Sequence, residues 1–450
     1  MAGLKYDKII KYIFKAKCEG PLHIGSAVGG REDVLIHPVD NSPFVQASSI
    51  AGVFRSYANR YMDVDVNELF GSSSLDKDKS TTEQQSRIRF SDGKFDLDTL
   101  KMELRPHVKI DRKTGSVSSS KSSGQKFDME YIGSGATFTA TLYVYVNSAG
   151  NNSLDTNVRE MLGAMKAGVL QFGAKRSSGA GIIVPISVKS KEFNMNNEAD
   201  RKEWFDEESL TDDKYTEIID DLPNVISQKN KYKVIVRGKT EGNILIKGIA
   251  VSEFGENAPD CENIRNSQGE YIIPGSSIRG AVRSQMEKIS SYIGKESLIE
   301  VAYGKVGKDR EEGYAGNLIF ADAIIGKQES NEKVDLRHRI HIDKFTGGVF
   351  QTGLFAEKNA FGDIELEITI ANKNQPDATL GLLLMAIRDL ASKVMTLGSG
   401  YATGKGFIDV SEIIVSSGDS VATVIYGEDI QVNDSDNIIK NAIDALKEVS

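Results

Sequence analysis

The feature that most constrains this chain is an internal duplication. The segment Ser48-Ser-Ile-Ala-Gly-Val-Phe-Arg55 lines up with Ser276-Ser-Ile-Arg-Gly-Ala-Val-Arg283 at a spacing of 228 residues. Three further landmark pairs keep one order in both halves, at offsets between 222 and 232. They are Glu19-Gly20 with Glu241-Gly242, Arg105-x-x-Val-x-Ile-Asp111-x-x-Thr-Gly115 with Arg337-x-x-Ile-x-Ile-Asp343-x-x-Thr-Gly347, and Gly173-x-x-x-x-x-Gly179-x-Gly181 with Gly398-x-x-x-x-x-Gly404-x-Gly406. This pattern predicts two copies of one structural unit.

Each copy has the same expected order of elements, namely strand, helix, strand, strand, helix and strand. Strands are indicated by runs rich in Ile, Val, Thr and Tyr, and helices by apolar residues at helical spacing. This order is typical of the ferredoxin-like split pattern, so the fold class is α+β with two tandem domains. The expected strands are Lys8–Cys18, Arg87–Ser91, Thr137–Val146 and Ile182–Val188, then Lys231–Thr240, residues 317–321, Asp363–Ile370 and Phe407–Val415; the helices begin at Ser48 and Ser276 and recur at Val158–Phe172 and Ala378–Leu397.

Both copies also predict a protruding β-hairpin. Residues Arg105–Ile110 and Lys126–Tyr131 alternate polar and apolar side chains around a polar tip at Lys113–Gln125. Such a pattern favours a long two-stranded hairpin. The equivalent in the second copy is Arg337–Glu357, whose tip is more apolar.

The distribution of charge sets the domain boundaries. We expect a first repeat at 1–190, an acidic linker at 191–229, a second repeat at 230–415 and an acidic tail at 416–450 with a C-terminal helix. The net charge is -9, but residues 198–221 carry -8 and the tail carries -5, so the remainder is mildly basic at +4. A basic stripe at Lys101–Lys126 is compatible with RNA contact and also with an ordinary solvated hairpin.

Composition excludes several classes. No apolar run reaches membrane-spanning length, and the N-terminus lacks the apolar core of a signal peptide, so we expect a cytoplasmic protein without a membrane partner. Two cysteines, Cys18 and Cys261, exclude a disulfide framework and a cysteine-rich zinc site. No spacing of His and Cys suits zinc.

Two local motifs suggest nucleic-acid contact, each with a structural alternative. Ser276 or Ser277 is a good N-cap after Pro274-Gly275, and the amides at such a helix start suit a phosphate; taken alone, the stretch favours an ordinary capped core helix. The loop Leu397–Gly406 runs from helix to strand and lacks the spacing of a nucleotide-phosphate loop, which disfavours ATP. It suits close approach of an RNA backbone or a left-handed helix cap.

Together these motifs resemble the RAMP superfamily, specifically the backbone subunit of type III CRISPR effector complexes. The match rests on Ile-Pro-Gly-Ser-Ser-Ile-Arg-Gly, on an aspartate upstream of it, on the Arg-x-x-Ile-x-Ile-Asp-x-x-Thr-Gly run and on the late glycine loop. It spans both repeats and is stronger in the second. The chain looks like two backbone units fused.

The resemblance implies two ferredoxin-like, RRM-type sheets with thumb hairpins that grip a guide RNA and kink its duplex with a target RNA. An aspartate with Mg²⁺ or Mn²⁺, and no organic cofactor, would support cutting of the target. Asp260 fits the family form Asp-x-x-x-Ile-Lys/Arg, and Asp33 fits it loosely; both are catalytic and metal-binding candidates. Implied partners are guide RNA, target RNA, neighbouring backbone units, small subunits and a large signature subunit. Candidate RNA-binding residues are Ser48, Ser49, Arg55, Arg105, Lys109, Arg112, Lys175, Arg176, Gly275, Ser276, Ser277, Arg279, Arg283, Arg337, Arg339 and Lys405.

Two alternatives remain at this point. The same fold can serve as an inactive RNA-binding scaffold, with cutting done elsewhere in the complex. It can also be a metal-independent endoribonuclease that processes guide RNA, for which His23 and His341 would be the acid/base candidates. His23 lies in an apolar strand, which favours a core or RNA-contacting histidine.

Overall fold

A computed structural model describes residues 6–25, 33–72, 85–108, 110–111, 126–147, 153–206, 214–225, 230–248, 259–305, 307, 313–326 and 335–449. Its contacts divide the chain into two compact units. Unit 1 comprises Met1–Met102, Tyr131–Arg176 and Ala180–Gln228, and unit 2 comprises Glu103–Glu130, Ser177–Gly179 and Lys229–Ser450. Each unit has its own apolar core.

Unit 1 is built on an antiparallel sheet whose central strand is β1 (Lys8–Cys18). It lies between β7 (Thr137–Val146) and β8 (Ile183–Asn194), and β3 (Ile88–Phe90) pairs with the far side of β7. This β8-β1-β7-β3 order belongs to the ferredoxin-like fold. The short strands β4 (Gly93–Phe95), β2 (Phe44–Val45) and β9 (Thr216–Glu217) extend the sheet.

The helices of unit 1 bury an apolar stripe against this sheet. Helix α1 (Ala47–Tyr61) buries Ile50 and Phe54, and α3 (Leu154–Lys166) buries Val158 and Leu162. Helix α3 starts four residues before the predicted start and ends six before the predicted end. The helix ends there because Gly168, the residue after the C-cap Ala167, has a φ of +68°. A right-handed helix cannot continue through this left-handed conformation, which glycine adopts readily. The remaining helices are α2 (Val66–Phe70), α4 (Glu198–Phe205) and the 3₁₀ turn η1 (Arg176–Ser178).

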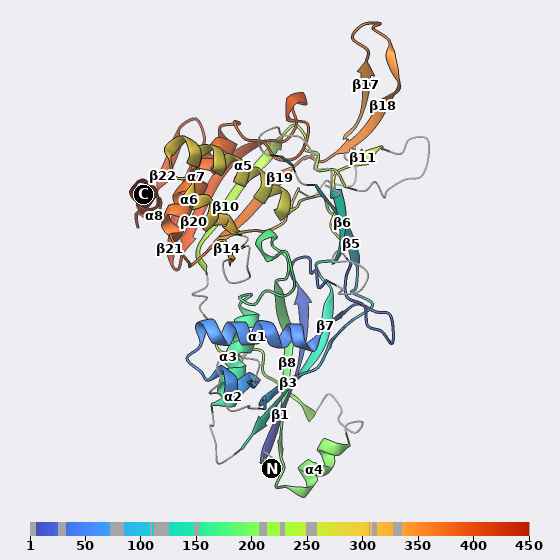
Figure 1. Ribbon diagram of the computed structural model, residues 1–450, viewed down its shortest axis with the longest axis vertical. Coiled ribbons are helices and arrows are strands. Elements are labelled where there is room, and N and C mark those ends of the chain that lie inside the picture. Colours follow the sequence, from blue (N-terminus) through green and yellow to red (C-terminus); the bar gives the residue numbers. More distant parts are fainter. Residues whose placement is uncertain are drawn as a thin grey trace. The chain divides into compact units, whose positions relative to one another are not determined.

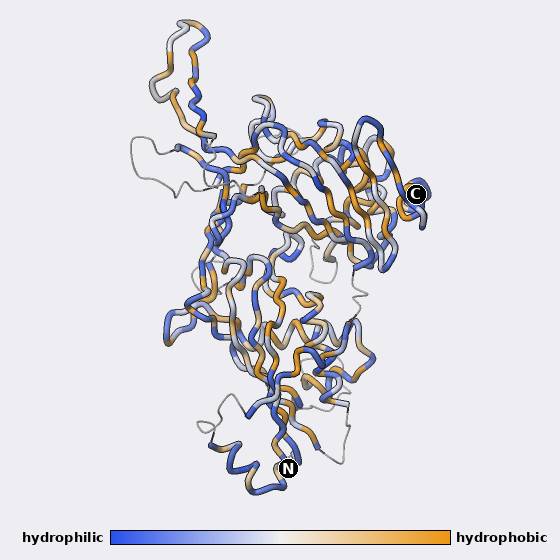
Figure 2. Tube along the Cα trace, turned by 180° about the vertical axis from the view of Figure 1, so that it is seen from behind, coloured by the Kyte–Doolittle hydropathy of each residue, from blue (hydrophilic) through white to orange (hydrophobic). Residues whose placement is uncertain are grey.

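Unit 2 repeats the plan. Strand β10 (Asn230–Glu241) lies between β19 (Asp363–Ala371) and β20 (Phe407–Ser417), and β15 (Leu318–Phe320) flanks β19. Figure 1 shows the helices of this unit over its sheet, and Figure 2 shows apolar and polar residues alternating along the strands. The helices are α5 (Gly275–Ile293), α6 (Ser297–Tyr303), α7 (Pro376–Ala391), η4 (Tyr401–Thr403) and α8 (Ile438–Glu448). Short strands are β11 (Cys261–Glu262), β12 (Ile272–Ile273), β13 (Gly304–Lys305), β14 (Tyr314–Ala315) and β16 (Ala323–Ile324).

Both predicted hairpins are present. Strands β5 (Met102–Val108) and β6 (Lys126–Ile132) form the first, most of which belongs to unit 2. Strands β17 (Asp335–Ile342) and β18 (Val349–Asn359) form the second, which extends away from the sheet of unit 2 (Figure 1). The tip of the first hairpin lies outside the described residues.

Equivalent hydrogen bonds confirm the duplication independently of sequence. The Phe172 amide donates to the Gly181 carbonyl, and the Leu397 amide donates to the Gly406 carbonyl in the same way. One buried pair that the sequence did not signal is also duplicated, since the Tyr12 hydroxyl bonds Asp155 and the Tyr232 hydroxyl bonds Asp377. The predicted α+β fold, with two tandem ferredoxin-like domains, is thus confirmed.

The segments expected to be linker and tail are largely folded. In the linker, α4 places Trp204 edge-on against Phe193, at 5.2 Å between ring centroids, and Ile218 and Leu222 enter the core of unit 1. In the tail, β21 (Ser420–Tyr426) and β22 (Ile430–Asn433) extend the sheet of unit 2. The amphipathic helix predicted at 437–449 is α8, which packs on α7. Acidic composition therefore marked additions to each unit rather than free connections.

Candidate nucleic-acid interface

In each repeat, an aspartate carboxylate from elsewhere in the chain binds the first amide of the first helix. The Gly275 amide at the start of α5 donates to Asp322 Oδ1 at 2.8 Å, and the Ala47 amide at the start of α1 donates to Asp92 Oδ1 at 2.7 Å. A carboxylate at a helix N-terminus satisfies one free amide and interacts favourably with the helix dipole. The first amide of each helix is thus already bonded to a carboxylate, which disfavours a phosphate at that amide, and phosphate contact elsewhere at the helix start stays a prediction.

The predicted serine caps are corrected as well. The N-cap residues are Gln46 and Pro274, and neither helix has a side-chain cap from its own serines. Ser48, Ser49, Ser276 and Ser277 instead lie within the first turn, and Ser48 is exposed. The sequence suggested a cap from residue type alone, whereas the carboxylate from a distant turn is the group that bonds the first amide.

The two glycine loops are shaped by the chain's own backbone. Gly181 and Gly406 have φ of +86° and +80°, and a Cβ there would overlap the carbonyl oxygens of Phe172 and Leu397, respectively. The amides of the two glycines donate to the carbonyls of Pro21 and Asn243. Close approach of the chain's own backbone within each unit accounts for these two glycines, which is neither the RNA contact nor the left-handed helix cap that the sequence suggested.

Arg105, predicted to bind RNA, is buried in unit 2. Its guanidinium contacts Asp322 at 2.7 Å and Glu103 at 2.6 Å, and only 6% of the residue is exposed. Burial alone would lower the pKa of Arg105, but attraction to the carboxylates of Asp322 and Glu103 raises it, so the side chain stays charged. A buried, doubly paired arginine supports protein packing and disfavours the predicted contact of Arg105 with RNA.

An ionic cluster with a buried centre lies at the base of the β17–β18 hairpin; we call it the hairpin-base cluster. It consists of Arg339, Glu357, Asn359, Thr403 and Lys405. Lys405 is 2% exposed, and its ammonium group pairs with Glu357 and donates to Asn359 Oδ1 at 3.0 Å. Arg339 Nε lies 2.8 Å from the same Glu357 carboxylate. Lys405 therefore fixes the glycine loop to the hairpin, and its burial disfavours the predicted contact with phosphate.

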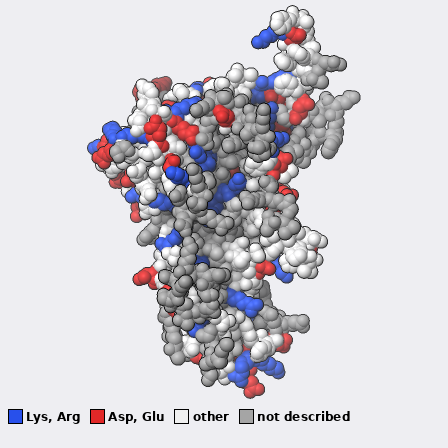
Figure 3. Space-filling model, viewed as in Figure 1, with Lys and Arg blue, Asp and Glu red and all other residues white. Residues whose placement is uncertain are grey.

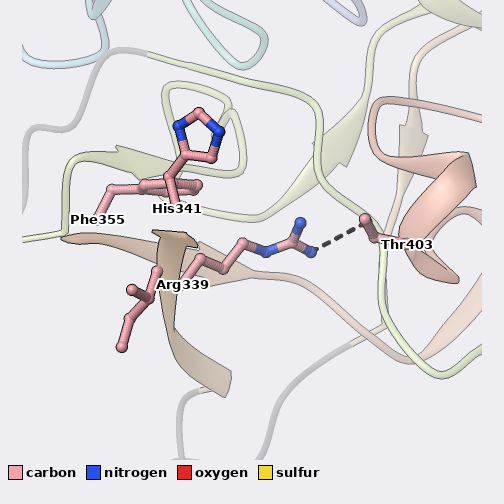
Figure 4. A pocket seen from close by; sticks show the side chains of 5 residues that line it. Arg339, His341, Phe355 and Thr403 are labelled. Carbon is pink, nitrogen blue, oxygen red and sulfur yellow. Dashed lines mark hydrogen bonds between the residues drawn. The ribbon is translucent and has the colours of Figure 1, made fainter. Parts of the chain in front are cut away.

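A pocket opens on the outer side of this cluster. It has a volume of about 570 Å³ and is lined by Arg339, Ile340, His341, Phe355 and Thr403. Figure 4 shows the Arg339 guanidinium reaching across to Thr403 Oγ1, a 3.1 Å hydrogen bond, with His341 and Phe355 beside it. Aromatic rings next to a cation suit stacking of a nucleobase and contact with its phosphate.

His341, one of the residues that line the pocket, stacks on the ring of Phe350 on the same hairpin. Its ring lies 4.8 Å from that of exposed Phe350 with planes inclined by 22°. In the first hairpin His107 stacks on Phe127 at 5.2 Å. Both hairpins therefore carry a histidine stacked on a phenylalanine, a feature that residue spacing did not reveal.

Asp260 is exposed at the same hairpin base. Its amide donates to the Ala356 carbonyl at 2.9 Å, and its Oδ2 accepts from the Ala356 amide at 2.6 Å. These reciprocal bonds fix the carboxylate beside the backbone of Ala356. Asp33 is also exposed, in the segment before the bridge between Val34 and Gly25.

The fit of a divalent metal can be tested on the donor set. Within the described residues, no three His, Cys, Asp or Glu side chains come together as a metal site. Mg²⁺ commonly binds through one or two carboxylates with the rest of its shell supplied by water and substrate phosphates. A single fixed carboxylate such as Asp260 fits that mode.

The other candidate residues occupy varied surroundings. Lys175 and Arg176 are exposed, and Lys175 adopts a φ of +59°. Arg279 and Arg283 lie over the Tyr303 ring at 5.1 and 5.0 Å. Arg55 donates to Asn67 at 3.4 Å, Arg337 is exposed, and Lys109 and Arg112 lie outside the described residues. Basic and acidic side chains are interspersed on the face of unit 2 seen in Figure 3.

His23 is buried rather than presented to a substrate. It is 2% exposed, and its ring lies 5.5 Å from that of Tyr131. This burial favours the core interpretation and removes one of the two histidines proposed for guide processing.

Comparison with known protein families finds a match for this sequence. The sequence model of the RAMP superfamily matches residues 15–184 and 234–409, most of both repeats. The chain belongs to the RAMP superfamily. RAMP proteins bind RNA within CRISPR–Cas complexes, and some members are ribonucleases. No curated protein matches the sequence. In the part of the chain that the structure describes, no helix is long and apolar enough to cross a membrane.

Proposed function

We propose that this RAMP protein is a double backbone subunit of a type III CRISPR effector complex, which holds a guide RNA and cuts the bound target RNA. The proposed partners are guide RNA, target RNA, neighbouring backbone units, small subunits and a large signature subunit. The observation that carries the proposal is the base of the β17–β18 hairpin, where the exposed Asp260 carboxylate accepts from the Ala356 amide and the preceding residue, Phe355, lines a pocket together with Arg339 and His341.

The hairpin base supplies the components of an RNA site. Arg339 is held by Glu357 and Thr403, so its guanidinium is oriented before RNA arrives. Phe355 and His341 offer rings against which an unstacked base can pack. In our proposal, a base held there brings its sugar and phosphate to Asp260, which is bonded to Ala356, the residue after Phe355.

Cleavage of an RNA strand at such a site requires few catalytic groups from the protein. RNA carries its own nucleophile in the ribose 2′-OH, and alignment of that oxygen with the phosphorus supplies much of the rate. In our proposal, Asp260 accepts the 2′-OH proton or holds Mg²⁺ or Mn²⁺ beside the phosphate, where the metal would stabilise developing charge. Arg339 orients the phosphate, and Asp33 plays the role of Asp260 in the first repeat.

The test uses the complex reconstituted with guide RNA and an end-labelled complementary target. Asp260→Asn is expected to abolish one cut, and Asp33→Asn a second, while filter binding of the target stays within about twofold of wild type. Asp419→Asn is the matched control, since Asp419 is an exposed aspartate in the turn between β20 and β21. Chelation with EDTA should stop both cuts.

Each other outcome selects a different function. Unchanged cutting in both variants would show that the chain is an RNA-binding scaffold. Cutting of repeat RNA by the isolated chain in EDTA would show a guide-processing enzyme, for which His341→Ala is then the diagnostic variant.

A further inference from the structure

The outer face of the unit 1 sheet, on the side away from α1 and α3, is basic and aromatic. On β1, Tyr12 enters the core of unit 1, so its neighbour Lys11 lies on the opposite face. Residues directly opposite each other on antiparallel strands share a face, and Tyr143 of β7 and Lys191 of β8 are the partners of Lys11. Other side chains on this face are Lys15, Arg89, Lys189 and Phe193. Every residue of β1, β3, β7 and β8 is described, and none on this face is acidic.

We call Lys11, Tyr143, Lys189, Lys191 and Phe193 the unit 1 platform. Its cations and its rings are interleaved. The Lys11 ammonium lies 5.8 Å from the centroid of the Tyr143 ring, and the Lys191 ammonium lies 5.3 Å from that of Phe193. Single-stranded nucleic acids are held by this combination, since aromatic rings stack on bases while cations attract phosphates.

The matching face of unit 2 has a different chemistry, because glutamates of neighbouring strands neutralise its cations. Lys233 on β10 pairs with Glu367 at 2.9 Å, and Arg237 pairs with Glu365 at 2.8 Å and with Glu412 at 3.1 Å. A solvated sheet face commonly pairs opposite charges across its strands in this way. The basic, aromatic face is therefore a property of the unit 1 sheet and not of the duplicated fold.

Helix α4 covers the unit 1 platform with a single ring. Trp204 lies edge-on to Tyr143 and to Phe193, with ring centroids 5.7 and 5.2 Å apart, respectively. No residue of α4 is fully buried, and the residue after Trp204, Phe205, is 81% exposed. The helix thus rests on the sheet through Trp204 and does not join the core of unit 1.

The same helix brings a carboxylate to the platform. Glu203 lies 2.7 Å from the Lys191 ammonium and 3.0 Å from that of Lys214. Glu203 and Trp204 therefore set one anion on a platform cation and one ring against the platform rings. These are the two contacts that a phosphate and its base would make.

The hydrogen bonds that tie α4 to the end of β8 involve other residues of the helix. Asp200 Oδ2 accepts from the Asn194 amide at 2.8 Å, and Arg201 donates to the Met195 carbonyl at 2.7 Å. Release of the contacts made by Trp204 leaves these bonds in place. The helix can therefore lift from the platform while it stays attached to β8.

We propose that the unit 1 platform is a binding site for a single-stranded nucleic acid, and that α4 is a flap that occupies the site until the strand displaces it. A base stacks on Tyr143 and Phe193 in place of Trp204, and a phosphate meets Lys191 in place of Glu203. The site uses neither the β17–β18 hairpin nor Asp260, so it stands or falls independently of the proposed cutting function.

The test is the fluorescence of Trp204, which is the single tryptophan of the chain and so reports this site alone. The full chain, freed of nucleic acid, is titrated with oligouridylate and with oligothymidylate of about ten nucleotides. Displacement of the flap should move the emission maximum to longer wavelength and increase quenching by acrylamide, whereas a strand bound elsewhere changes neither. A shift with either oligonucleotide supports the site, and comparison of the two shows whether it requires the ribose hydroxyl.

Two pairs of variants test the competing ring and the cations. Trp204→Ala should bind labelled oligouridylate at least about fivefold more tightly in fluorescence anisotropy, because the ring that competes with the base is gone. Phe205→Ala, at the next position of α4, is the matched control and should bind as wild type does. Lys189→Ala should raise the oligonucleotide concentration at half-maximal Trp204 shift by about threefold or more. Lys8→Ala makes the same charge change on the opposite face of β1 and should leave that concentration unchanged.

Circular dichroism checks that each variant is folded. Trp204 emission and quenching that stay unchanged at saturating concentrations of both oligonucleotides would overturn the proposal. So would a Trp204→Ala protein that binds no more tightly than Phe205→Ala, or a Lys189→Ala protein that titrates as Lys8→Ala does.

Discussion

Lys405 and Glu357 form an ion pair in the interior of unit 2, and their counterparts in the first repeat are Ala180 and Met129. The counterparts follow from equivalent backbone bridges, Leu22 with Ile132 and Ile244 with Ala360, and from the glycines that follow positions 180 and 405. All four side chains are buried. The two repeats have thus filled corresponding interior positions with opposite chemistry, charged in one and uncharged in the other.

Removal of one charge from this pair should be costly. Lys405→Ala leaves Glu357 buried with Arg339 as its remaining cation, and we expect unit 2 to lose about 3 kcal/mol of unfolding free energy. The double variant Lys405→Ala with Glu357→Met, which installs the residues of the first repeat, should recover most of that loss. Urea unfolding followed by circular dichroism measures both. Trp204, the single tryptophan, lies in unit 1, so its fluorescence emission reports the unfolding of that unit and serves as the internal control. A double variant no more stable than the single one would contradict the expectation.

A pair of glycines separates backbone strain from steric overlap. Gly404 and Gly406 have φ of +78° and +80°, but a Cβ at Gly404 meets nothing within 4 Å, whereas one at Gly406 overlaps the Leu397 carbonyl. Gly404→Ala should therefore cost about 1–2 kcal/mol, the usual penalty of a left-handed alanine. Gly406→Ala should cost clearly more, because the backbone at Leu397 and the start of β20 must also separate. Thermal unfolding of the two variants compares them, and equal losses would show that the loop relaxes freely.

Cys18 should make stability fall at high pH. Burial, with a smaller contribution from Glu19, raises the pKa of the Cys18 thiol to about 12. In the unfolded chain the pKa of a cysteine thiol is about 8.5, so the folded state binds the proton more tightly. The resulting stability is fully present below that pH and is lost as pH rises toward 12. Between pH 7.5 and 10, wild type should lose about 2 kcal/mol more than Cys18→Ala in denaturant titrations. Parallel curves for the two proteins would contradict the prediction.

Lys175 and Arg176 should contribute to RNA affinity through charge. Both are exposed, Lys175 just before η1 and Arg176 as its first residue. The double variant Lys175→Ala with Arg176→Ala should weaken binding of single-stranded RNA and reduce the slope of log K against log salt by about 1.4. Fluorescence anisotropy over a series of salt concentrations gives the slope. Lys440→Ala is the control, and an unchanged slope in the double variant would remove these residues from the interface.

The sequence predicted the architecture because the architecture depends on repeated, periodic signals. Residues 137–146 alternate at period two and form β7 at those bounds, and the pair of Ser-Ser-Ile segments located α1 and α5. Helix ends were placed less well, as for α3, because tertiary contacts decide where the last turn stops.

The chemistry of the site was harder to predict, because it depends on contacts between residues distant in sequence. Asp92 and Asp322 are single aspartates in short turns, and nothing near them marks a helix cap. Arg105 and Lys405 belong to a basic stripe and a glycine loop by composition, but partners more than forty positions away make them interior residues. Asp260 was located by its resemblance to a family motif, and its exposure agrees with that placement.

The ion pair between Lys405 and Glu357 also bears on how the two halves of this gene diverged. A change at only one of the two positions leaves a buried charge without its partner in this pair. Evolution from the charged pair to the uncharged pair, or the reverse, therefore passes through a less stable intermediate. Recombination that copied only one of these two positions from the opposite half would produce the same defect. The two halves are therefore protected against homogenisation at this point, and each is free to specialise.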